Sequence, residues 1–150
     1  TLFRSYSLEY SNNVDGLMDK KLKILNELSD ISKKSPGGVI LIHPEDYLNR
    51  YIPLYTNFFV FTGLTNENIT ILPFCGKFGL MNDTCREREE LGYSLIKDIN
   101  KNNLEKINLK YDIDYLLIQK EENLNIANLE IFKKIYEDET YILYEVVNEN

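Results

Sequence analysis

Amphipathic helical segments alternate with short apolar runs along this chain, and that alternation restricts the fold more than any single motif does. Apolar residues recur at spacings of three and four from Leu17 to Leu28, which predicts a helix with one buried face. Ser35-Pro36-Gly37-Gly38 ends that helix, and the run Val39–Ile42 follows at once. A short, β-branched, wholly apolar run is typical of a central strand covered on both faces.

The later segments continue this alternation. Thr84 and Glu87 have the capping-box spacing that starts a helix. Apolar residues at 126, 129, 132 and 136 have helical spacing, whereas "TYILYEVV" at the end alternates like an edge strand with one buried face. The elements expected after Ile42 begin with a short helical piece within 46–55, strands at 57–62 and 69–73, a helix at 84–100 and a short helical piece at 104–109. A strand at 115–118, a helix through 126–136 and a strand at 140–147 are expected to follow.

This order predicts an α/β fold. We expect a small mixed sheet of about four strands with helices packed on its faces, a Rossmann-like layered sandwich. At 150 residues the chain has the length of one domain, and residues 1–13 have the composition of a connector or arm. The chain begins at Thr1 without a methionine, so we expect it to be a fragment of a longer protein.

Charge, hydropathy and cysteine content argue against several kinds of partner and site. Net charge is 17 − 24 = −7, a sign that argues against nucleic acid as a partner. No run approaches the roughly 20 apolar residues that span a bilayer. Cys75 and Cys85 could form a disulfide or remain free thiols, and the chain lacks the Cys/His spacing of a zinc site.

His43, the only histidine, directly follows the apolar run at 39–42. Ligands of open α/β sheets collect at the carboxyl ends of strands, and His43, Glu45 and Asp46 would lie at such an end. They could act as an acid–base group. The competing interpretation is structural: Pro44 turns the chain, the two acids cap a helical turn, and His43 packs at the end of the strand. Because no second histidine or ligand spacing accompanies them, we predict neither a metal nor a cofactor.

Two further features have a ligand-binding and a structural interpretation. "REREE", which begins at Arg86, could hold an anionic or sugar ligand or could be a solvated helix face. The aromatic residues between Tyr47 and Phe61 could stack on sugar rings or pack in a core. The phosphate-binding GxxxxGK[ST] loop, the GxGxxG fingerprint and the GxSxG elbow are all missing from the sequence, so no motif favours a nucleotide-binding protein or a hydrolase.

Three segments together resemble a known family. They are "LMDKKLKILNELSDISKKSPGGVILIHPE", "YIPLYTNFFVFTG" and "REREELGYSLIKDINKNNLEKINLKYDIDYLLIQ" with the later "FKKIYEDETYILYEV". Their order, over residues 17–147, is similar to the soluble C-terminal region of polytopic bacterial membrane proteins of the GT-C glycosyltransferase type, which are dolichyl- or polyprenyl-phosphate-sugar-dependent and mannosyltransferase-like. One departure stands out: Asn57-Phe58 occupies the place where such tails often have Gly-Arg, and Arg50 or Arg86 would have to replace that arginine.

The resemblance implies a location and a role. The chain would be an extracytoplasmic domain beside the membrane part of its own parent protein, which transfers sugar from a lipid-phosphate donor. Catalytic acids would lie outside this chain, and Pro53, Tyr55 and Thr56 would join the candidate ligand-binding residues. We therefore expect a non-catalytic accessory domain that contacts an acceptor, a glycan or a lipid-linked sugar. The alternatives are a free-standing enzyme using His43, Glu45 and Asp46, and a protein-interaction domain.

Overall fold

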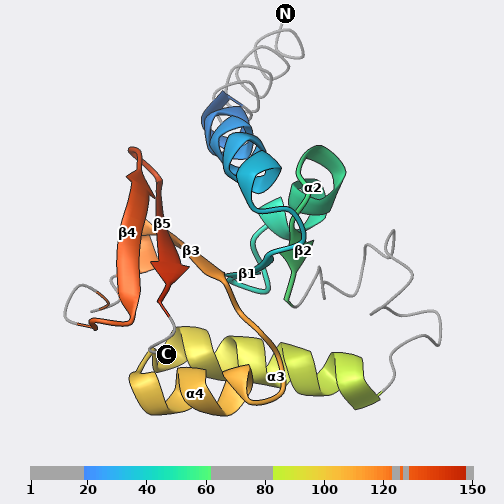
Figure 1. Cartoon of the computed structure of the whole chain (residues 1–150), viewed down its shortest axis with the longest axis vertical. Coiled ribbons are helices and arrows are strands. Elements are labelled where there is room, and N and C mark those ends of the chain that lie inside the picture. Colours follow the sequence, from blue (N-terminus) through green and yellow to red (C-terminus); the bar gives the residue numbers. More distant parts are fainter. Residues whose placement is uncertain (1–18, 62–82, 123–125, 127–128, 148–150) are drawn as a thin grey trace, which may run out of the picture.

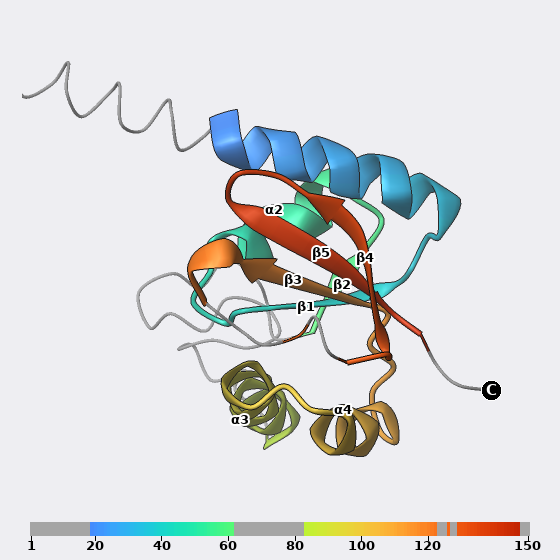
Figure 2. The same cartoon turned by 90° about the vertical axis from the view of Figure 1, so that its left-hand side faces the viewer.

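A computed structural model describes residues 19–61, 83–122, 126 and 129–147 of the chain. These residues form an α/β fold in which a five-stranded mixed sheet lies between two layers of helices (Figure 1, Figure 2). The strand order is β2-β1-β3-β5-β4. The predicted fold class is therefore confirmed, with one strand more than expected.

The sheet has a parallel half and an antiparallel half. Strand β1 (Val39–Ile42) pairs in parallel with β2 (Phe59–Val60) and with β3 (Tyr115–Gln119). Strand β5 (Tyr141–Val146) runs antiparallel to β3 and to β4 (Phe132–Glu137). Since β1 and β3 are parallel neighbours, their carboxyl ends meet at one edge of the sheet.

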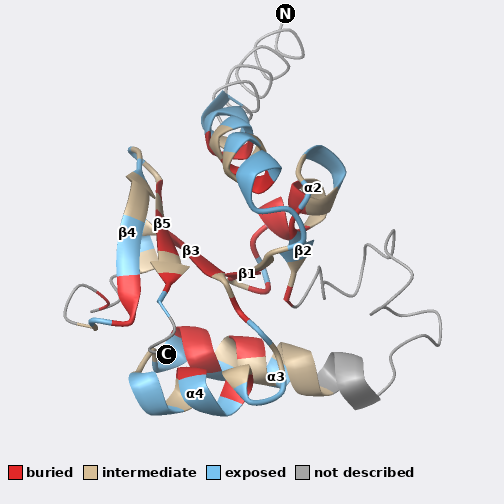
Figure 3. Ribbon diagram, viewed as in Figure 1, coloured by how far each residue is buried: buried red, intermediate tan, exposed pale blue. Residues whose placement is uncertain are grey.

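Each face of the sheet has its own apolar core. On one face, a helix over residues 19–34 and α2 (Leu48–Tyr55) cover Ile40, Leu117 and Leu143. On the other, α3 (Asp83–Lys97) and α4 (Lys101–Asn108) cover Leu41, Leu116 and Tyr144. Successive strand residues point to opposite faces, so both cores draw on the same strands. Strands β1, β3 and β5 are buried along most of their length, whereas β4 is buried only at its start (Figure 3).

Several predicted elements match the structure. Strand β1 has the predicted bounds, α2 lies within the segment expected to be helical, and α3 begins one residue before its expected start and ends at Lys97. Strand β3 extends one residue beyond its predicted end, and β2 is shorter than expected. The arm at residues 1–13, the strand at 69–73, Cys75 and the side chains of Thr84, Cys85 and Arg86 lie outside the described part of the molecule.

Two predictions about the C-terminal region were wrong. The segment expected to continue as a helix through residue 136 contains β4, which pairs with β5 from Phe132 to Glu137. Strand β5 is not an edge strand, because β3 and β4 flank it. Its alternation instead distributes side chains between the two cores: Tyr141 and Leu143 enter one, Tyr144 and Val146 the other.

Candidate functional site

Polar side chains gather where β1 and β3 end. The loop at residues 43–47 follows β1, and a single 3₁₀ turn, Lys120–Glu122, follows β3. The antiparallel β5 begins at the same edge with Tyr141, which pairs with Gln119. Three distant segments of the chain therefore meet at the edge of the sheet where α/β proteins bind their ligands.

Asp46 joins these segments. Its Oδ2 accepts hydrogen bonds from Gln119 Nε2 at 2.6 Å and from the Tyr141 hydroxyl at 3.1 Å. Its Oδ1 accepts from the amide of Leu48 at 2.9 Å, in the first turn of α2. Asp46 is 7% exposed and Tyr141 1%. Burial and the neighbouring Asp46 carboxylate raise the pKa of the Tyr141 hydroxyl, which therefore stays protonated and donates to Asp46.

A buried amide reinforces the same turn. Asn49, fully buried in α2, donates from Nδ2 to the carbonyl oxygens of His43 at 2.7 Å and Asp46 at 3.1 Å. These bonds hold the loop against the start of the helix. Of the two acids expected to cap a helical turn, Asp46 bonds through its side chain to the Leu48 amide at the helix start, whereas Glu45 accepts the Tyr93 hydroxyl.

His43 and Glu45 are held on the other side of this loop. His43 Nδ1 accepts from the amide of Glu45 at 3.2 Å, and its ring meets the ring of Tyr93 edge-on with centroids 5.7 Å apart. The Tyr93 hydroxyl donates to Glu45 Oε1 at 3.2 Å. These contacts tie the loop after β1 to α3 and do not place His43 beside a nucleophile.

Sequence reasoning missed three participants, namely Gln119, Glu122 and Tyr141. Burial raises the pKa of Glu122, whose Oε2 accepts from the amide of Gln119 at 3.1 Å. The effect of His43 on the pKa of Glu122 is opposite to that of burial, because a positive imidazole favours the ionised carboxylate. The sequence does contain an indication for Gln119. This residue directly follows an apolar run, just as His43 does.

A surface hollow of about 380 Å³ lies over Asp46, and we call it the strand-end hollow. Its wall includes Tyr47, which is 46% exposed and has the Lys21 ammonium 5.2 Å from its ring centre. The remaining lining residues are Lys20, Glu45, Gln119, Lys120, Glu121, Glu139, Thr140 and Tyr141. Cationic, anionic and amide groups therefore surround one partly exposed aromatic ring.

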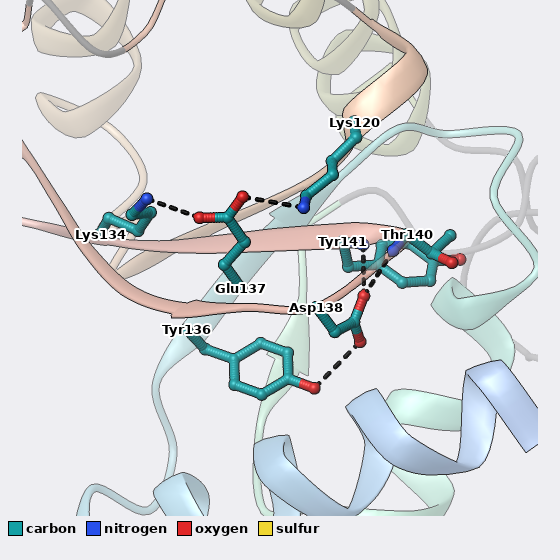
Figure 4. A network of polar contacts seen from close by, with 7 residues as sticks. All are labelled: Lys120, Lys134, Tyr136, Glu137, Asp138, Thr140 and Tyr141. Carbon is teal, nitrogen blue, oxygen red and sulfur yellow. Dashed lines mark hydrogen bonds and ion pairs between the residues drawn. The ribbon is translucent and has the colours of Figure 1, made fainter.

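The β4–β5 turn forms one rim of the strand-end hollow, to which it contributes Glu139 and Thr140. Figure 4 shows the polar contacts around this turn. Asp138 accepts the amides of Thr140 and Tyr141, each at 2.7 Å, and the Tyr136 hydroxyl at 2.9 Å. Burial opposes ionisation of Asp138, but these bonds outweigh it and its pKa lies below the ordinary value. Beside it, Glu137 bonds to Lys120 and Lys134, which lowers its pKa to about 2. The rim is therefore fixed by ionised carboxylates.

The residues that the family resemblance singled out lie elsewhere. Pro53 and Tyr55 belong to the last turn of α2, at the end of the helix opposite Asp46. Thr56 has a structural role, because its hydroxyl donates to the Ile52 carbonyl at 2.6 Å and accepts the Phe58 amide at 3.1 Å. Tyr55 is 60% exposed. The candidate residues thus divide between two ends of α2 and do not form one site.

The charged segment that begins at Arg86 is partly structural. Arg88 lies with its guanidinium carbon 5.0 Å from the ring centre of Phe61 and 5.6 Å from that of Tyr111, and it donates to the Val60 carbonyl at 3.3 Å. Glu87 pairs with Lys110 at 2.7 Å. These contacts attach α3 to β2 and to the segment after α4. A uniformly solvated helix face is therefore the wrong description for the part of the segment that is described.

The described side chains include no group of three or more His, Cys, Asp or Glu that could hold a metal ion. No helix among the described residues combines the length and apolar character needed to cross a membrane. Comparisons with protein-family models, with curated proteins and with solved structures each gave no match.

Proposed function

We propose that this chain is a non-catalytic accessory domain of a membrane-bound glycosyltransferase-type protein, on the extracytoplasmic side, and that it contacts an acceptor or glycan. The proposal of a non-catalytic role rests on the hydrogen bonding of the Asp46 carboxylate. Its two carboxylate oxygens accept bonds from Leu48, Gln119 and Tyr141, all within the domain. The best-placed carboxylate at the ligand-binding edge of the sheet therefore stabilises the fold and is already engaged by three donors of the domain itself.

The glycan part rests on the strand-end hollow. Its partly exposed Tyr47 ring offers an apolar surface, and the surrounding carboxylates, amide and hydroxyls can bond to sugar hydroxyls. Charges of both signs line the wall, so the hollow suits a neutral polyhydroxylated ring better than a simple anion. The membrane part rests on the family resemblance of residues 17–147.

A titration of the isotopically labelled chain with methyl glycosides tests the glycan contact. We expect saturable shifts of amide signals at residues 45–47, 119–121 and 139–141. Tyr47→Ala should weaken this binding about tenfold, because it removes the stacking ring. Tyr55→Ala is the matched control: it removes another exposed tyrosine at the far end of α2 and should leave the affinity unchanged. Equal loss in both variants, or no shifts with any glycoside, would contradict the proposed contact.

The coding sequence upstream of Thr1 tests the membrane part. We expect it to encode several apolar segments of about 20 residues each, the length that spans a bilayer. A reading frame without such segments would refute the accessory-domain proposal. It would favour the free-standing enzyme, for which the half-buried Glu122 near His43 is the specific supporting observation.

A further inference from the structure

A second surface hollow, of about 240 Å³, adjoins the strand-end hollow. The residues that line it are Asp19, Lys20, Lys23, Asp138, Glu139 and Thr140. Three of them, Lys20, Glu139 and Thr140, also line the strand-end hollow. Lys20 and Glu139 are exposed, so neither forms a buried barrier between the two hollows. We call the two hollows together the helix–turn groove.

Two segments form the walls of the second hollow. One wall is the start of the helix over residues 19–34, and the other is the β4–β5 turn, which lies beside it (Figure 2). Burial of Asp138 opposes its ionisation, and the charge of Lys23 on the helix is one of the effects that nevertheless lower its pKa. The turn is fixed, because Asp138 also accepts the amides of Thr140 and Tyr141. The second hollow therefore lies between two ordered segments that act on one another.

The two walls differ in charge. The helix contributes Lys20 and Lys23 with one acid, Asp19, whereas the turn contributes Asp138 and Glu139. None of the ion pairs printed by the geometry of the described residues joins one wall to the other. Ammonium groups, which only donate hydrogen bonds, and carboxylates, which only accept them, therefore stand on opposite sides of an open space.

A hydroxyl group suits such a space, because it both donates and accepts hydrogen bonds. Hydroxyls along a ligand can accept from the lysines of the helix and donate to the carboxylates of the turn. An anion would meet the carboxylates and a cation would meet the lysines, and either like-charge contact is unfavourable. The strand-end hollow alone lies near the lower end of the range for ligand sites, roughly 300–1,000 Å³, and the second hollow extends it.

We propose that the helix–turn groove binds a linear, uncharged oligosaccharide and not only a single sugar. One ring stacks on Tyr47 in the strand-end hollow, and the following rings run past Thr140 toward Lys23. Lys20 and Glu139, which line both hollows, bind the ring at the junction. This inference rests on the proposed glycan contact and deepens it, because it assigns the length and the charge of the ligand.

The dependence of affinity on chain length tests the groove. We would titrate the labelled 150-residue chain with uncharged saccharides of one, two and three rings, in series built on glucose, mannose and N-acetylglucosamine. In at least one series the affinity should rise about tenfold from one ring to three. The shifted amide signals should then extend from residues 45–47 and 119–121 to residues 20–23 and 138–140. Glucosamine and glucuronic acid, which carry charges of opposite sign, should bind no more tightly than glucose.

Two lysine variants locate the additional rings. Lys23 lines the second hollow and not the strand-end hollow. Lys23→Ala should therefore weaken binding of the three-ring saccharide about fivefold and leave binding of the one-ring saccharide unchanged, because it removes one hydrogen-bond donor. Lys34→Ala is the matched control, since it removes an exposed lysine at the other end of the same helix, and it should affect neither ligand. Far-ultraviolet circular dichroism checks that both variants fold.

The contrary outcomes separate this inference from the proposed function. If one-ring saccharides bind in the strand-end hollow and longer ones bind no more tightly, the glycan contact stands and the groove is wrongly assigned. Equal effects of Lys23→Ala and Lys34→Ala on the three-ring saccharide would mean that the added rings lie elsewhere. Tighter binding of glucosamine or glucuronic acid than of glucose would assign the groove to a charged ligand. Absence of binding at every chain length would contradict the glycan contact itself, and the groove with it.

Discussion

Asp46→Ala is expected to lower the free energy of unfolding by roughly 3–4 kcal/mol, a large part of the stability of a domain this size. The substitution leaves the buried Tyr141 hydroxyl and the Gln119 amide without their common acceptor. It also removes the side-chain bond to the Leu48 amide at the start of α2, and lost helix caps cost about 1 kcal/mol. Chemical denaturation followed by circular dichroism would measure the change.

Three variants distinguish the junction role of Asp46 from a general loss of charge. Glu45→Ala removes a neighbouring exposed carboxylate and should change stability by less than about 1 kcal/mol. Asp46→Asn should have an intermediate effect, because its single acceptor oxygen cannot serve all three donors. In the double variant with Tyr141→Phe, part of the Asp46→Ala loss should disappear, since no unpaired hydroxyl remains. An Asp46→Ala variant as stable as the parent would mean that the three bonds contribute nothing.

The parallel half of the sheet could be predicted from the sequence because its strands are buried on both faces. Val39–Ile42 and Tyr115–Ile118 are wholly apolar, and each is bounded by polar or turn-forming residues. The amphipathic spacing before Ser35 likewise reflects a helix with one face on the sheet. In these segments the local hydrophobic pattern matches the tertiary environment, so the pattern alone is sufficient to predict the element.

Strand β4 could not be identified in the same way. Its pairing with β5 shifts register between Lys134 and Tyr136, which breaks the two-residue alternation that identifies a strand. Just before and at the start of β4, the amides of Leu129 and Phe132 bond to the carbonyls three residues back, those of Ile126 and Leu129, and that spacing imitates a helix. The strand is specified by its partner β5, which a local pattern cannot show.

The strand-end site was predicted in position but not in composition. The sequence places His43, Glu45 and Asp46 after a buried strand, and the structure keeps them there. The partners that decide the role of Asp46, Gln119 and Tyr141, are 73 and 95 positions away. Only the pairing of β3 with β5 brings those two together. The choice between a catalytic and a structural role for this short loop therefore depends on contacts with residues near the other end of the chain.

The two glycines before β1 should respond to substitution in opposite orders, because they are required for different reasons. Gly37 has φ +83°, but a Cβ there would have only ordinary contact with its surroundings. Its requirement is conformational, so Gly37→Ala should cost about 1 kcal/mol and Gly37→Asn less, since asparagine tolerates the left-handed region. Denaturation midpoints of the two variants would show this order.

At Gly38 the requirement is space. A Cβ would lie 3.1 Å from the Tyr115 ring and 3.2 Å from the Phe58 ring, and these two rings pack with centroids 5.0 Å apart in the core. Gly38→Ala should therefore cost about 1–3 kcal/mol, and the larger Gly38→Asn more, which reverses the order at Gly37. The same order at both positions would show that one cause acts at both. A reversed order would establish that Gly37 turns the chain into β1, whereas Gly38 lets an aromatic pair close over the start of that strand.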